Sequence, residues 1–159
     1  MRELGPMDSG PVTDLWTIGY EKAAWPDVLA TLRAAGIARV IDVRQLPLSR
    51  RAGFSKRQLA AGLAEAGIGY VHLRALGTPP EGREANRRRQ WERFWRIVDE
   101  SLATLDAGLA LQQAAGMARA APSCLLCYEA DPGICHRRRV GELMAAEHGF
   151  SMHHLSVRT

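Results

Sequence analysis

Residues 124–148, CLLCYEADPGICHRRRVGELMAAEH, contain a short apolar run, a turn and an amphipathic segment, in that order. The run from Cys124 to Tyr128 is typical of a buried strand. Asp131-Pro132-Gly133 is typical of a turn, and the segment from Cys135 to about His148 predicts a helix. A strand followed by a helix is the repeating unit of α/β proteins, so this stretch predicts an α/β fold.

The same order of apolar run, turn and amphipathic segment occurs along the rest of the chain. It predicts further strands at residues 15–18, 37–43, 70–73 and 152–157, and helices at 25–36, from 55 to 67 or 69, and from 84 to about 114. Right-handed crossovers would wind this βαβαβαβαβ order into a mostly parallel sheet. We therefore predict a three-layer α/β fold, with helices on both faces of the sheet and the last strand at an edge.

The segment from Glu84 to about Ala114 is the longest predicted helical region, with Gly108 and Gly116 as candidate breaks. Apolar residues spaced four and three apart predict the face that packs in the core: Trp91, Trp95, Val98, Leu102 and Leu105. Residues 83–96 also hold six arginines against two glutamates. Arginines interleaved with tryptophans are typical of a nucleic-acid surface, but the tryptophans belong to the predicted core face, which favours a solvated arginine face on a core helix.

The chain has 159 residues and a formal net charge of +4, and apolar residues make up 47% of it. This length predicts one domain, residues 13–159, after a flexible arm of residues 1–12. The apolar share excludes the disordered and fibrous classes. Lys22 and Lys56 are the only lysines, so arginine carries nearly all the positive charge and favours phosphate or carboxylate partners.

All three cysteines lie between Cys124 and Cys135, which does not suit a disulfide framework and indicates a reducing, cytoplasmic setting. No apolar run approaches the roughly 18 residues of a membrane-spanning helix. The first residues also lack the apolar centre of a signal peptide. We therefore expect a cytoplasmic protein without a membrane partner.

Polar residues follow the predicted strands at the points where these end. The pairs in chain order are Gly19 and Tyr20, Asp42 and Arg44, His72 and Arg74, and Cys127 and Glu129. Asp42 lies within an apolar run, where an unpaired carboxylate is costly, and Arg44 on the same strand face is its candidate partner. Because ligands bind at the carboxyl ends of parallel strands, we predict one site at this rim of the sheet.

Cys135 and His136 lie at a predicted helix N-terminus, which favours anions and lowers the pKa of a thiol. They are the most reactive pair in the sequence, and the alternative is a buried Cys135 beside a capping His136. Cys124 and Cys127 point to opposite faces of a strand and cannot both bind one ion, so we expect Cys124 in the core. Zinc held by Cys127, Cys135, His136 and a fourth ligand is a less favoured alternative, and we expect neither a metal nor a cofactor.

The loop from Arg44 to Phe54 is basic, and Arg50, Arg51, Lys56 and Arg57 together suit a phosphate or a nucleic-acid strand. The Cys-x5-Arg loop of cysteine phosphatases is absent, because glycine stands six residues after both Cys127 and Cys135. Neither GxGxxG nor GxxxxGK[ST] occurs. The sequence therefore predicts phosphate binding without a known nucleotide fingerprint.

Four motifs resemble the bacterial and archaeal family of domain of unknown function 488: TIGYE at 17–21, DVRQLPLSRRAGFSK at 42–56, YVHLRALG at 70–77 and LLCYEADPGICHRRRV at 125–140. The resemblance runs from Thr17 to about Leu155. It implies that the family's signature residues are matched by Gly19, Asp42, Arg44, Pro47, Ser49, Arg50, Phe54, His72, Leu76, Gly77, Cys127, Glu129, Asp131, Cys135, His136 and Arg137. The family often has a histidine–serine pair where this chain has Tyr20 and Glu21. Since the family has no established general activity, the resemblance supports one rim site and names no substrate.

We predict a small cytoplasmic enzyme, a hydrolase or transferase, that acts on a phosphate-bearing substrate such as a nucleotide or a nucleic-acid component. The candidate catalytic residues are Asp42, His72, Glu129, Cys135 and His136. The candidate phosphate-binding residues are Gly19, Tyr20, Arg44, Ser49, Arg50 and Arg137. A nucleic-acid-binding module and a thiol-dependent sulfur-transfer or redox protein remain as alternatives.

Overall fold

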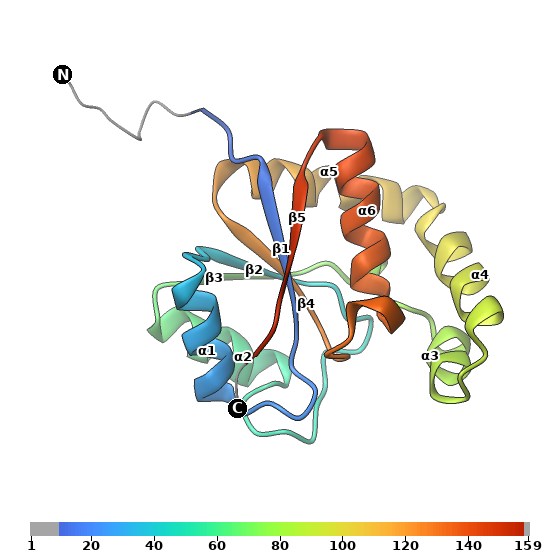
Figure 1. Ribbon diagram of the computed structural model, residues 1–159, viewed down its shortest axis with the longest axis horizontal. Coiled ribbons are helices and arrows are strands. Elements are labelled where there is room, and N and C mark those ends of the chain that lie inside the picture. Colours follow the sequence, from blue (N-terminus) through green and yellow to red (C-terminus); the bar gives the residue numbers. More distant parts are fainter. Residues whose placement is uncertain (1–9, 158–159) are drawn as a thin grey trace.

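The computed structural model of the chain describes residues 10–157. In this range five strands form a parallel sheet in the order β3-β2-β4-β1-β5 (Figure 1). The strands are β1 (Asp14–Gly19), β2 (Arg39–Asp42), β3 (Gly69–His72), β4 (Ser123–Cys127) and β5 (Ser151–Leu155). The predicted parallel sheet is confirmed, and β5 lies at an edge, as predicted.

Helices cover both faces of the sheet, as predicted (Figure 1). Helices α1 (Trp25–Ala34) and α2 (Lys56–Glu65) lie on one face. On the other face lie α5 (Leu105–Ala120) and α6 (His136–His148), with α3 (Pro80–Arg87) and α4 (Trp91–Leu102) beside them. Two short 3-10 turns, η2 (Arg74–Leu76) and η3 (Pro132–Ile134), lie in the loops after β3 and β4.

Side chains that alternate along each strand divide the core into two layers. Leu15 of β1 and Leu125 of β4 pack with α4, α5 and α6. Ile18 and Leu126, on the opposite face of the same strands, pack with α1 and α2. Burial on both faces explains why these strands have continuous apolar sequences and confirms the three-layer prediction.

The helical region predicted from Glu84 to about Ala114 contains three helices, α3, α4 and α5, and the predicted positions of its breaks are wrong. The first break follows α3, where Arg89 takes a left-handed conformation with φ of 56°. The second break precedes α5, where the Thr104 side chain accepts a hydrogen bond from the Ala107 backbone N–H at 3.2 Å. Gly108 and Gly116, the candidate breaks, lie inside α5.

The predicted core face of this region is also partly wrong. Phe94, Val98 and Leu102 are the buried residues of α4. Trp91 is 36% exposed and Leu105, which belongs to α5, is 77% exposed. Because α4 ends at Leu102, the helical spacing does not continue to Leu105, and Phe94 rather than Trp91 faces the core.

The predicted flexible arm of residues 1–12 falls mostly on residues 1–9, outside the described part of the chain. Val12, its last residue, donates a backbone hydrogen bond to the Arg119 carbonyl at 2.9 Å. None of the described helices is long and apolar enough to cross a membrane.

β4 lies between β1 and β2, and the connection that follows it crosses the opposite face of the sheet from the connections that follow them. The chain moves from β1 through β2 to β3 along one face, then returns through β4 to β5 along the other. The loops after β2 and β4 therefore leave neighbouring strands toward opposite faces. Such a switch point is where parallel α/β sheets bind ligands.

Candidate functional site

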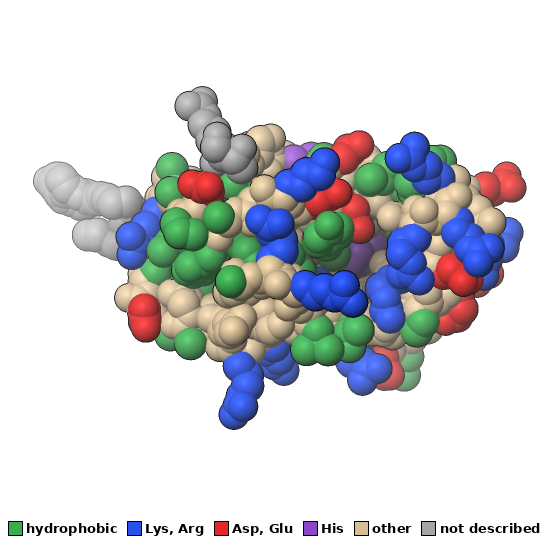
Figure 2. All heavy atoms as spheres, turned by 90° about the horizontal axis from the view of Figure 1, so that it is seen from below, with side chains coloured by type: hydrophobic (Ala, Val, Ile, Leu, Met, Phe, Trp, Pro, Cys, Tyr) green, Lys and Arg blue, Asp and Glu red, His purple; other side chains and the backbone are tan. Residues whose placement is uncertain are grey.

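A cavity of about 560 Å³ opens at this switch point. Its walls come from the ends of β1 and β4, the loop after β2, and helix α3, and it includes four arginines: Arg44, Arg50, Arg83 and Arg87. Figure 2 shows Lys and Arg side chains gathered around a hollow in which histidine is visible. The predicted location of a site at the strand ends therefore coincides with a cavity of the size that small ligands occupy.

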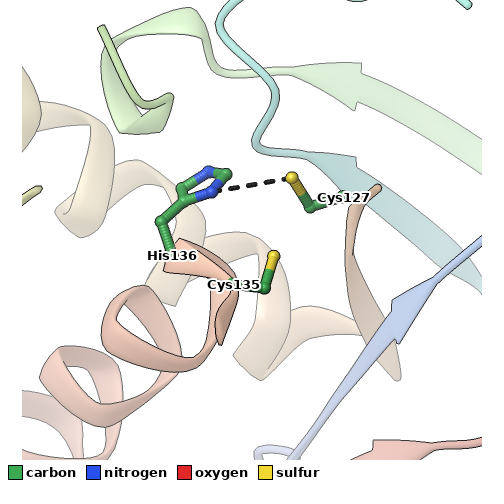
Figure 3. A group of neighbouring side chains, drawn as sticks. All are labelled: Cys127, Cys135 and His136. Atoms are coloured by element: carbon green, nitrogen blue, oxygen red, sulfur yellow. Dashed lines mark hydrogen bonds between the residues drawn. The ribbon is translucent and has the colours of Figure 1, made fainter. Parts of the chain in front are cut away.

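Two thiols and an imidazole lie together where β4 ends and α6 begins (Figure 3). Cys127 is the last residue of β4, Cys135 caps the N-terminus of α6, and His136 is the first residue of that helix. Their sulfur and nitrogen atoms all lie within 4.8 Å of one another, and all three residues are buried. Cys127 and His136 line the cavity.

The His136 ring is fixed by hydrogen bonds on both sides. Its Nε2 lies 2.7 Å from the Val43 carbonyl oxygen, and its Nδ1 lies 3.6 Å from the Cys127 Sγ. A carbonyl oxygen can only accept, so Nε2 carries a proton. In the neutral ring Nδ1 therefore presents a lone pair to the thiol.

The two thiols differ in their affinity for a proton. Burial would raise the pKa of Cys135, but hydrogen bonds with Cys127 and His136 and the charges of His136 and Arg137 lower it well below its ordinary value. The hydrogen bond with Cys135, together with burial, raises the pKa of Cys127. Of the two thiols, Cys135 therefore gives up its proton more readily.

Glu129 lines the same cavity two residues after Cys127. Burial raises its pKa to about 8, and the charge of Cys135 and a hydrogen bond with it act in the same direction. A carboxyl group with this pKa exchanges a proton near neutral pH.

Arg137 holds the loop that carries Glu129. It is fully buried, and its Nε donates to the Thr17 Oγ1 at 3.1 Å. Its two terminal nitrogens donate to the carbonyl oxygens of Glu129 and Ala130. This predicted phosphate-binding residue therefore fixes the loop after β4 and does not line the cavity.

Gly19 has a related packing role where β1 passes this loop. A Cβ added at Gly19 would overlap the Glu129 carbonyl oxygen. Only glycine allows the two backbones to approach so closely. Gly19 therefore positions Glu129, and its own atoms do not line the cavity.

Asp42 and Arg44 form a buried ion pair, with Asp42 Oδ2 2.7 Å from Arg44 Nη2. Asp42 also accepts a hydrogen bond from the Tyr70 hydroxyl at 2.7 Å. The Arg44 Nη1 donates to the Tyr20 hydroxyl and to the Phe54 carbonyl. Arg44 thus uses four of its five N–H groups on protein atoms, and the pair supports the cavity wall formed by Tyr20.

His72, the last residue of β3, and Ser49, in the loop after β2, differ in their position relative to the cavity. His72 Nε2 lies 2.6 Å from the Arg44 carbonyl oxygen, and His72 does not line the cavity. Ser49 does line it, and its backbone N–H donates to Ser55 Oγ at 3.0 Å. Ser55 is the N-cap of α2, but its side chain makes no capping hydrogen bond and bonds to the Ser49 carbonyl instead.

The cations that remain available to a ligand lie elsewhere on the cavity rim. Arg50 and Arg87 line it and make no side-chain hydrogen bond or ion pair with residues 10–157. Arg83, one helical turn before Arg87, donates to Gln45 Oε1 and to the Thr78 carbonyl. Sequence reasoning placed Arg83 and Arg87 on a solvated helix face and so missed their place at the cavity.

Thr78 and Cys127 are further cavity residues that the predicted site set omits. The Thr78 hydroxyl is buried and has no hydrogen-bond partner in the described part of the chain. The sequence could have identified Cys127 as a cavity residue, because it shares a strand face with Glu129. No sequence signal identifies Thr78, because the loop after β3 reaches the cavity only through the sheet order.

Of the predicted catalytic residues, the structure brings Glu129, Cys135 and His136 together and leaves Asp42 and His72 behind the cavity wall. Fold and site define a parallel α/β protein with a thiol–imidazole–carboxyl cluster and free arginines around one switch-point cavity.

The chain belongs to the family described as Domain of unknown function DUF488, whose model matches residues 24–144. This confirms the predicted resemblance. The match contains the cluster but neither β1 nor β5, so it is narrower than the predicted span from Thr17 to Leu155. Comparison with curated proteins gave no match, and comparison with solved structures gave none either.

Proposed function

We propose that the protein is an enzyme that acts on a phosphate-bearing substrate in the switch-point cavity. One observation carries the proposal: Arg50 and Arg87, which have no partner among residues 10–157, line the same cavity as Glu129 and His136. Unpaired guanidinium groups bind phosphate oxygens in pairs of parallel hydrogen bonds. The anion would then lie beside groups that can exchange protons.

The residues of the cavity suggest separate roles. Arg50, Arg83 and Arg87 would bind the phosphate, and the Thr78 hydroxyl would gain a hydrogen-bond partner from the substrate. Glu129 and the Nδ1 of His136 would act as proton donor and acceptor. Asp42 and His72, which do not line the cavity, would position the loop after β2.

The remaining lining favours a nucleotide or a nucleic-acid component. Tyr128 is 42% exposed, and Leu46 and Leu48 are also exposed at the cavity. An aromatic ring beside apolar side chains suits a flat base, with its phosphate toward the arginines. The volume of about 560 Å³ lies within the usual range for ligand pockets.

Thermal unfolding with a panel of ligands tests this proposal. Inorganic phosphate, pyrophosphate and nucleoside mono-, di- and triphosphates would be compared at matched ionic strength. A ligand at 100 times its Kd should stabilise the protein by about 2.7 kcal/mol. We expect a selective nucleotide shift that Arg50→Ala and Arg87→Ala each reduce, while Arg88→Ala, an exposed neighbour outside the cavity, leaves it unchanged.

Turnover of the ligand so identified is the second part of the test. Glu129→Gln should lower kcat by about 10²–10⁴-fold, the usual contribution of a general acid or base, with a small change in KM. Absence of a shift with every phosphate compound, or equal shifts in the wild type and both arginine variants, would remove the proposal.

A thiol-dependent sulfur-transfer or redox protein is a second candidate. It is favoured by the Cys127 and Cys135 sulfurs, which lie within 4.8 Å of each other, with Cys127 bordering the cavity. It predicts rapid alkylation of Cys135, the thiol whose pKa is lowered, by iodoacetamide in the reduced, chelator-treated protein, and turnover with a thiol co-substrate that Cys135→Ser abolishes. Slow alkylation of every cysteine together with full activity of Cys135→Ser would exclude it.

A further inference from the structure

We propose that Cys127, Cys135 and His136 bind one zinc ion, with the fourth coordination position open to the cavity. Two cysteine sulfurs and a histidine nitrogen form one of the ligand sets that zinc uses in catalytic sites. Here the three donor atoms lie within 4.8 Å of one another (Figure 3). The proposal goes beyond the proposed function, because none of these ligands is an arginine of the phosphate site. With zinc on the His136 Nδ1, Glu129 would be the group that exchanges protons in the cavity.

The separation of the donors fits tetrahedral zinc. Zinc bonds of about 2.3 Å to sulfur and about 2.0 Å to nitrogen, at the tetrahedral angle, place the two ligand atoms about 3.5 Å apart. The Cys127 Sγ and the His136 Nδ1 are 3.6 Å apart. The distances from the Cys135 Sγ to the other two donor atoms are no more than 4.8 Å.

The protein also supplies the outer hydrogen bond that metal-binding histidines have. The His136 Nε2 donates to the Val43 carbonyl at 2.7 Å and so turns Nδ1 toward the sulfurs. Arg137, the next residue, fixes the loop between the two cysteines through the Glu129 and Ala130 carbonyls. The three ligands are thus held from the end of β4 and the start of α6 before any ion arrives.

The charges of the three side chains also favour a bound zinc ion. Burial of an unpaired thiolate is costly, whereas Zn²⁺ with two thiolates and a neutral imidazole has no net charge. Cys135 is fully buried, and Cys127 and His136 face the cavity. An ion bound between them would therefore present its open position to the cavity, where water, a phosphate oxygen or the Glu129 carboxylate can reach it.

The expectation of no metal weighed two ligand sets. Cys124 and Cys127 do lie on opposite faces of the sheet, and the set of Cys127, Cys135 and His136 was the less favoured alternative. The thiols that converge are Cys127 and Cys135, eight residues apart and joined by the loop after β4. Cys124 offers a matched control, since it is a buried cysteine of the same strand that faces the other core layer.

The test uses the full chain, purified under reducing conditions without chelator. Metal content is measured by mass spectrometry, and chelator-treated protein is titrated with Zn²⁺ and Co²⁺. We expect about one equivalent of metal, and with Co²⁺ the thiolate charge-transfer and tetrahedral d–d absorption bands. Cys127→Ser, Cys135→Ser and His136→Gln should each weaken zinc binding by more than the 10–100-fold typical of outer-shell changes, and Cys124→Ser should keep full stoichiometry.

Absence of bound metal in the reduced wild type, with no cobalt bands on titration, would overturn the proposal, as would unchanged binding in Cys127→Ser and His136→Gln. Circular dichroism shows whether each variant folds. If the buried Cys135→Ser variant does not fold, the Cys127 and His136 variants still test the proposal, because these two side chains border the cavity. Arg50→Ala and Arg87→Ala should bind zinc normally. If these variants lose the nucleotide-induced thermal shift but still bind zinc, the result tests the proposed phosphate site and leaves the zinc proposal intact.

Discussion

At the scale of single residues, the contact between Gly19 and the Glu129 carbonyl links the first strand to the functional loop. Gly19→Ala would force two backbone segments apart, because no flexible side chain can move away. We expect a loss of about 1–3 kcal/mol in the free energy of unfolding, the usual cost of overpacking, measured by urea denaturation. The control is Gly108→Ala inside α5, where an added Cβ meets open space and a gain of about 0.5–1 kcal/mol is expected. Equal effects of the two substitutions would contradict the packing role of Gly19.

The Asp42–Arg44 pair gives a second prediction at this scale. Asp42→Asn would leave the buried Arg44 guanidinium without its counter-charge, and removal of one partner of a buried pair costs about 3–5 kcal/mol. Chemical denaturation measures this loss. Asp14→Asn, which breaks an exposed pair with His153, should cost under about 1 kcal/mol. If Asp42→Asn abolished turnover but kept full stability, Asp42 would be catalytic and not a supporting residue.

Part of this residue-level picture could be predicted from spacing alone. Two residues on one strand face predicted the Asp42–Arg44 pair, and strand alternation predicted that Cys124 and Cys127 diverge. The bonds from Arg44 to Tyr20 and Phe54 could not be predicted, because they join segments 24 and 10 residues away. For that reason Arg44 resembled a ligand-binding residue in the sequence.

At the scale of elements, the Thr104 cap separates α4 from α5. Thr104→Ala removes the acceptor of the Ala107 N–H and should cost about 1 kcal/mol of stability in thermal or urea unfolding. Thr31→Ala within α1 is the matched control. The Thr31 hydroxyl only bonds back to the Asp27 carbonyl, and alanine favours a helix, so no loss is expected there. A larger loss at Thr31 than at Thr104 would contradict the capping role.

The elements themselves were largely predictable, and the exception has a local cause. Each strand and the helices α1, α2 and α6 follow from apolar periodicity and from punctuation by glycine or proline. Neither glycine nor proline marks the breaks before and after α4. The chain turns there through Arg89 in a left-handed conformation and through the Thr104 cap. Thr104 is a weak sequence signal for the start of α5, because threonine also occurs away from helix caps. Arg89 gives no signal for the end of α3, because arginine rarely adopts the left-handed conformation.

At the scale of the whole molecule, the order of the strands decides which arginines reach the cavity, and sequence periodicity does not encode that order. Parallel β3-β2-β4-β1-β5 packing brings α3 beside the loop after β4, where Asn86 donates to the Ile134 carbonyl at 2.7 Å. Arg83 and Arg87 enter the cavity with it. The rim location could be predicted from the fold class, but its anion-binding residues could not.

Some arginines line the cavity and others lie on the outer surface, and this difference gives a prediction about nucleic-acid binding. Arg88 and Arg96 are exposed and lie outside the cavity. Any low-salt association with a fluorescent oligonucleotide should weaken steeply with added salt and with the double substitution Arg88→Ala/Arg96→Ala. The nucleotide thermal shift should survive that double substitution. Oligonucleotide binding that depends instead on Arg50 and Arg87 would show that the cavity accepts a nucleic-acid strand.

The position of β1 between β4 and β5 has a consequence for biosynthesis. Of the five strands within residues 10–157, the one synthesised first pairs with the two synthesised last. About 100 residues separate Gly19 from Ser123, so at roughly 5–20 residues per second β1 waits about 5–20 s for its first neighbour. The same β4 ends in Cys127, so the nascent chain acquires its reactive cluster only as the sheet closes around it.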